Sequence, residues 1–231
     1  DPTLWKDWVQ NEGTPVKVPV YHDIRREGKD TLLYNKYGKP IGIQKESSLY
    51  FEQTCFPYLD ADEDTSFDDL EEAFHDNMWA EIGTYPAPYG FDEKGLKKRE
   101  ELLARVADSE KALYGIFGGN IHENGSYMFR MDNWLAYLAC EPEMVERFLD
   151  KLLEQHMKNL EIFLKYYKGK IQVIGFGDDL GAQNAPQMSP QMYRTMIKPY
   201  HQKMWEFVHK TDPDVKICLH CCGSIFPLID D

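Results

Sequence analysis

The sequence has few cysteines, no excess of positive charge and no long apolar run. Lysine and arginine together number 26 against 39 aspartates and glutamates, which gives a formal net charge of -13. A surface of this sign repels phosphate backbones and anionic lipids, so we expect neither nucleic acid nor a membrane as partner. Because the chain also lacks the ~20 consecutive apolar residues of a membrane helix and a signal-peptide pattern at its start, we expect a soluble, cytoplasmic protein.

Five cysteines in 231 residues are too few and too unevenly spaced for a disulfide framework. Three of them, Cys218, Cys221 and Cys222, fall within five residues, which indicates reduced thiols with a chemical task. Cys218 and Cys221 form a C-x-x-C motif, but the redox version of that motif lies at a helix N-terminus. Here the motif falls in a predicted strand, so redox chemistry is disfavoured.

The texture of the sequence changes near residue 95. Residues 15–60 contain short extended runs separated by glycine and proline, the pattern of hairpins or a meander. Further along, apolar runs of strand length at 112–118, 171–177 and 215–220 alternate with helical patterns. This rhythm predicts a parallel sheet with helices outside it, either a doubly wound sheet or a (β/α)8 barrel.

Four helices are predicted between and around these strands, at 97–112, 131–140, 142–169 and 190–210. Pro142 stands at the first turn of its helix, where the missing N–H is tolerated. Pro199 lies inside the last helix, and we expect it to kink or interrupt that helix.

Polar side chains gather directly after each apolar run. In parallel α/β folds the reactive groups collect at the carboxyl ends of the strands, so these clusters carry the functional signal. The three clusters are 118–123, 177–183 and 220–224.

The last cluster contains a histidine and a cysteine two residues apart. Along a strand, His220 and Cys222 share a face with about 6.5 to 7 Å between their backbones. Imidazole and thiolate suit zinc, so the pair predicts half of a zinc site. A third ligand is expected from Glu123, Asp178 or Asp179, or from beyond the last residue. The alternative is that the pair ends a buried strand with ordinary hydrogen bonds.

The two earlier clusters supply further candidates. At least one of Asp178 and Asp179 should face a pocket, where a carboxylate orients substrate, transfers protons or supports a metal. Glu123 is a third catalytic candidate, and Gln183 and His122 are candidates for binding substrate. The structural alternative for Asp179 is that it caps the following turn.

Two segments together resemble the uroporphyrinogen decarboxylase superfamily, and within it the corrinoid-dependent methyltransferase branch. They are GFGDDLGAQNAPQMSPQMYRTMIKPY at 175–200 and VKICLHCCGSIFPLIDD at 215–231. The resemblance implies a (β/α)8 TIM barrel with its site at the carboxyl ends of the strands. Since members of the family continue beyond the position of Asp231, we expect an incomplete fragment of one barrel domain over 1–231 with its C-terminal strands missing. Residues 1–95 would be a variable hairpin and helical insert region, and 96–231 regular βα units.

The resemblance also implies an activity. In the methyltransferases a His-x-Cys pair binds zinc, which maps onto His220 and Cys222. The main prediction is therefore a zinc-dependent enzyme that moves a methyl group between a methylated small molecule or thiol and a corrinoid on a small partner protein. In the decarboxylases the aspartate that organises the tetrapyrrole pocket maps onto Asp178 or Asp179. A metal-free tetrapyrrole decarboxylase is the first alternative, and a non-catalytic module with a structural zinc site is the second.

Overall fold

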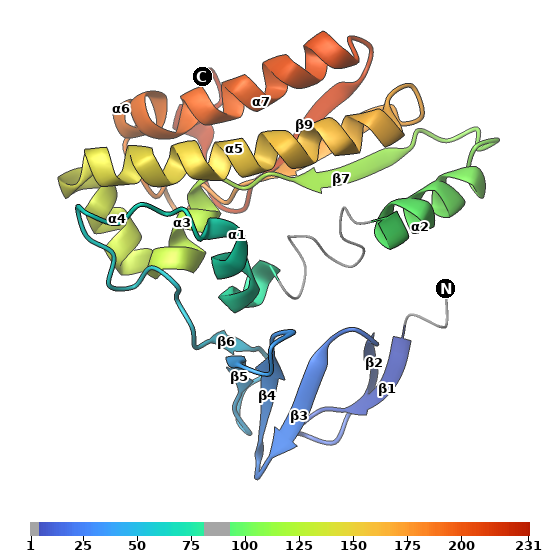
Figure 1. The fold of residues 1–231 in the computed structure, drawn as a ribbon, viewed down its shortest axis with the longest axis vertical. Helices are drawn as coiled ribbons and strands as arrows, with labels where there is room; N and C mark the ends of the chain where they lie inside the picture. Colours follow the sequence, from blue (N-terminus) through green and yellow to red (C-terminus); the bar gives the residue numbers. More distant parts are fainter. Residues whose placement is uncertain (1–4, 81–92) are drawn as a thin grey trace. The chain divides into compact units, whose positions relative to one another are not determined.

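The computed structural model describes residues 5–80 and 93–231 (Figure 1). The chain forms two compact units, one from residues 1–59 and 71–88, the other from residues 60–70 and 89–231. The single domain over 1–231 stays a prediction. Within the described ranges, no helix has the length and apolar character needed to cross a membrane.

The first unit consists of short antiparallel strands. β1 (Trp5–Val9) pairs with β2 (Pro15–Pro19). A second sheet has the order β3 (Asp23–Glu27), β4 (Asp30–Tyr34), β5 (Pro40–Gln44) and β6 (Glu52–Gln53). The predicted meander is confirmed, and its small core is formed by Ile24, Leu33, Ile41 and Met78.

The second unit is built on a parallel sheet. Its strands are β7 (Tyr114–Gly118), β8 (Val173–Gly177) and β9 (Lys216–His220), in that order. All three coincide with the predicted apolar runs, so their carboxyl ends meet at one edge of the sheet. The mixed α/β class with a parallel sheet is therefore confirmed.

Two helices precede β7, three lie between β7 and β8, and two lie between β8 and β9 in the described part of the chain. They are α1 (Leu70–Ala73), α2 (Glu93–Ala104), α3 (His122–Phe129), α4 (Met131–Cys140), α5 (Pro142–Tyr167), α6 (Pro190–Met192) and α7 (Lys198–Thr211). The predicted helix over 97–112 is wrong in extent, because α2 ends at Ala104 and turns follow it. The interruption expected at Pro199 is confirmed: a π-helical turn at Tyr193–Ile197 precedes α7, since proline has no N–H for an α-helical bond.

α5 and α7 lie side by side and cover one face of the parallel sheet (Figure 1). Phe117 packs against Phe163 of α5, and Phe176 packs against Trp205 of α7. The alternate residues of the strands point to the other face, where Ile116 is 74% exposed.

Candidate functional site

The loops that follow β8 and β9 are held together by a close backbone approach. The amide of Ser224 donates to the carbonyl of Ala182 at 2.8 Å. Gly223 has a φ of 80°, and a Cβ built on it would lie 2.4 Å from the carbonyl carbon of Gly181. A side chain at Gly223 or at Gly181 would clash with the backbone of the other loop, so the close approach of the two loops requires glycine at both positions.

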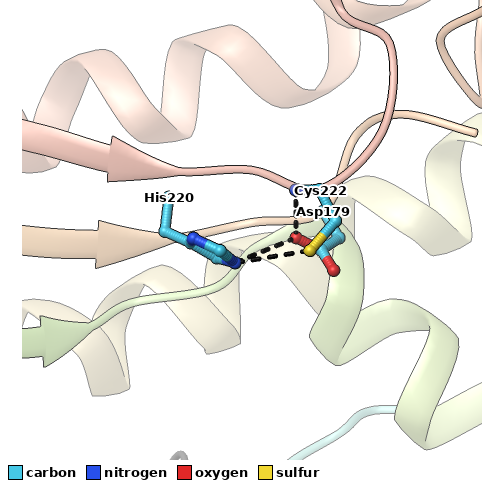
Figure 2. A group of neighbouring side chains, drawn as sticks. All are labelled: Asp179, His220 and Cys222. Atoms are coloured by element: carbon cyan, nitrogen blue, oxygen red, sulfur yellow. Dashed lines mark hydrogen bonds and ion pairs between the residues drawn. The ribbon is translucent and has the colours of Figure 1, made fainter.

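This crossing brings three donor groups together. His220 Nε2 lies 3.4 Å from Cys222 Sγ and 3.9 Å from Asp179 Oδ1 (Figure 2). The backbone N–H of Cys222 donates to Asp179 Oδ1 at 2.6 Å. All three ligand atoms lie within 4.8 Å of one another. The structure thus brings both predicted metal ligands together with one of the predicted third ligands.

The carboxylate also affects the thiol. Asp179 hydrogen-bonds the Cys222 thiol and repels negative charge on it, which raises the pKa of Cys222. A thiol held in its protonated form is a poor nucleophile. A metal ion would have to displace this proton to bind the sulfur.

The neighbouring aspartate occupies a different environment. Asp178 is fully buried, and its carboxylate accepts hydrogen bonds from the amides of His122 and Glu123, each at 2.9 Å, and from His201 Nε2 at 2.9 Å. Burial alone would raise the pKa of Asp178, but the hydrogen bond and charge of His201 outweigh it, so the pKa is lowered. Asp178 is an ionised interior anchor, whereas the side chain of Asp179 is 31% exposed.

His122 is buried as well. Trp134 Nε1–H donates to its Nδ1 at 3.0 Å, so Nε2 carries the proton and donates to Gln187 Oε1 at 3.2 Å. Burial lowers the pKa of His122, which is therefore neutral. Both ring nitrogens of His122 are hydrogen-bonded to side chains in the interior, so this predicted substrate-binding residue does not reach the surface of the edge.

Glu123 lies in the first turn of α3, at the same edge of the sheet. Its carboxylate accepts from the Tyr127 hydroxyl and from the side-chain amide of Asn120. Burial raises the pKa of Glu123, and the charges of the two aspartates add to that effect. Gln183, by contrast, is exposed in the loop after β8. Another glutamine, Gln187, donates to the carbonyl of Asp179 at 3.1 Å.

Two histidines of this network are absent from the sequence-based candidates. His201 contacts Asp178, and His156 Nε2 donates to the carbonyl of Asn120 at 2.9 Å. Burial lowers the pKa of His156 to about 4. A signal was present, because His156 interrupts the apolar stripe of α5 between Leu152 and Leu160. A polar residue on a buried stripe has to find a partner.

Comparison with known proteins adds the family. The sequence model of the family Uroporphyrinogen decarboxylase (URO-D) matches residues 96–231, which is more than half of the chain. The chain belongs to this family. A uroporphyrinogen decarboxylase of Trichodesmium erythraeum (strain IMS101) is 35% identical over 86 residues, which cover 37% of this chain and 22% of that protein. One of Synechococcus sp. (strain CC9605) is 33% identical over 90 residues, 38% of this chain and 23% of that protein. The match spans about a fifth of each relative's length. No solved structure matches the chain.

These relatives correct the activity expected from the sequence. The prediction of a corrinoid-dependent methyltransferase is wrong, because the matching proteins are named uroporphyrinogen decarboxylases. The His-x-Cys pair that favoured methyl transfer is a local feature, whereas the family match extends over the whole βα region. The zinc ion and the corrinoid partner stay predictions.

Proposed function

We propose that the full-length protein decarboxylates a carboxylated tetrapyrrole, on a (β/α)8 barrel of which the three parallel strands form a part. One observation carries the proposal within the described structure: at the carboxyl edge of the sheet, Asp179 presents a partly exposed carboxylate while its neighbour Asp178 is fully buried. Carboxylates accept hydrogen bonds from N–H groups such as those of pyrrole rings. Asp179 is therefore the group that would hold the substrate.

The reaction also needs a proton. When the bond between a side-chain carbon and its carboxylate breaks, CO2 leaves and the electron pair stays on the carbon, which then takes up a proton. Glu123 supports this step, because its raised pKa keeps a proton available at a higher pH than an ordinary glutamate. Asp179 would bind the rings while Glu123 donates.

A turnover assay with uroporphyrinogen as substrate tests the proposal. Asp179→Asn removes the negative charge with little change of shape, and we expect kcat/KM to fall by about a hundredfold. Asp214→Asn makes the same change at an exposed position before β9 and should keep wild-type activity. Equal activity in both variants, or no turnover by the wild-type protein, would contradict the proposal.

A metal-binding role at the same edge is the second candidate, favoured by the three converging donor atoms. Sulfur, imidazole and carboxylate are all ligands that zinc accepts, so the residues fit this ion. Asp179, His220 and Cys222 would hold it. Three protein ligands and one open position are typical of a catalytic zinc, which supplies a Lewis acid, whereas a closed structural site needs a fourth ligand.

Metal analysis of the purified full-length protein separates the candidates. Under the zinc proposal, the wild-type protein contains one zinc per chain, and His220→Ala and Cys222→Ser both lose it. Bound zinc without turnover supports a structural site. Turnover by zinc-free protein supports the decarboxylase alone. If both variants keep their zinc, the site does not lie at these residues.

A further inference from the structure

The buried network behind Asp179 contains one histidine that the proposed reaction does not use. His201 lies on α7, and its side chain is only 2% exposed. Its Nε2 must carry a proton, because the carboxylate of Asp178, 2.9 Å away, can only accept. The ring is fixed on its other sides by stacking on Trp205 and by the Tyr193 hydroxyl, 3.5 Å from Nδ1.

Burying Asp178 and His201 together costs free energy, because both polar groups leave water. Since both groups lose their hydration, the hydrogen bond between Asp178 and His201 is weak support for stability alone. What the pair does provide is a fixed orientation of the Asp178 carboxylate, because the three donors around it can be satisfied in only one orientation.

Asp178 lies beside Asp179 in the loop after β8 and connects this loop to two other segments that carry site residues, α3 and β9. Its carboxylate holds the amides of His122 and Glu123, which are the first two residues of α3. Its own amide donates to the carbonyl of His220 at 3.0 Å. α3 has only eight residues, among them asparagine and glycine, which are poor helix formers. The helix start therefore depends on this external acceptor.

We propose that His201 is a positioning residue: it orients the carboxylate of Asp178, which in turn fixes the first turn of α3 and so keeps Glu123 at the edge where Asp179 lies. The proposal rests on the proposed function only for the tasks given to Glu123 and Asp179. The positioning itself is independent of the reaction and can be measured without substrate.

Amide hydrogen exchange of the full chain, read by NMR, tests it. In His201→Phe, we expect the amides of His122 and Glu123 to exchange about tenfold faster or more, relative to the amides of α5. His201→Gln places an N–H near the position of Nε2 and should restore slow exchange. His209→Phe, at an exposed position of the same helix, should match the wild type.

The comparison with α5 separates local positioning from a general loss of stability. Should the phenylalanine variant fail to fold, His201→Asn replaces it, because its shorter amide cannot reach Asp178. Wild-type exchange of both amides in the variant that lacks the donor would overturn the proposal, and so would equally fast exchange in the glutamine variant. Neither result depends on whether the protein decarboxylates tetrapyrroles.

Discussion

Asp178 and Asp179 are identical in type and adjacent in sequence, yet their surroundings give them different tasks. Asp178 is enclosed by three donors and anchors α3, while Asp179 faces the open edge with His220 and Cys222. The sequence predicted that at least one carboxylate faces a pocket, but could not say which one. The buried one is Asp178, and one of its three donors, His201, lies 23 residues away in the chain.

The buried histidines make the fold sensitive to acid. His156 has a folded-state pKa of about 4, below the ~6.5 of an unfolded chain, so below pH ~6.5 the unfolded state binds a proton that the folded state excludes. Its contribution to the free energy of unfolding is present at neutral pH and is lost as the pH falls. Between about pH 7 and pH 5 we expect a loss of roughly 2 kcal/mol from this residue.

Urea unfolding of the wild type and of His156→Gln at both pH values measures this loss. The glutamine can still donate to the carbonyl of Asn120 but does not titrate. The variant should therefore lose about 2 kcal/mol less than the wild type over the same range. An identical pH dependence of the two proteins would show that His156 has an ordinary pKa in the folded state.

Glu123 gives a second prediction for a single residue. If it donates the proton, kcat falls as the pH rises through its raised pKa, because the donor form is lost. Glu123→Gln should lower kcat by about a hundredfold and abolish this pH dependence. Tyr127→Phe removes a hydrogen bond that lowers the pKa of Glu123, so the fall should move to higher pH. An unchanged profile in both variants would exclude Glu123 as the donor.

At the scale of elements, the sequence predicts what local pattern dictates. The three parallel strands and α5 are long, regular apolar patterns, and the structure has them at the predicted places. α3 was missed, because Asn124 and Gly125 weaken its helical signal and its first turn is held by Asp178 from another strand. In the hairpin region the apolar pattern predicts extended runs at 16–21, 31–34, 41–44 and 48–53, and it misses β3, because the sequence DIRRE is largely charged and exposed. The start of α3 is held by a residue more than 50 positions away, whereas β3 is held by its pairing with β4, the next strand in the chain.

The loop crossing at Gly223 gives a prediction for an element. Gly223→Ala forces a side chain into φ 80° and against the backbone of Gly181, so we expect a loss of about 2 to 3 kcal/mol in stability. Gly169→Ala is the matched control: φ is 69°, but the added Cβ meets nothing within 4 Å, and the loss should be about 1 kcal/mol. Thermal unfolding measures both. Equal losses would mean that the crossing is not closely packed.

At the scale of the whole molecule, charge opposes the proposed substrate. The 231 residues carry a formal net charge of -13, and a tetrapyrrole with several carboxylates is also an anion. Salt screens such repulsion over about 10 Å at 0.1 M. We therefore expect KM for uroporphyrinogen to fall when the ionic strength is raised from about 0.01 M to 0.1 M. A KM that rises with salt would indicate that local positive charge dominates binding.

Release of CO2 from uroporphyrinogen by the chelator-treated full-length protein is the most direct test of the decarboxylase proposal. The account predicts that CO2 is released without any bound metal and that Asp179→Asn nearly abolishes the release. Absence of CO2 release from the folded wild-type protein would contradict it, as would release that requires added zinc.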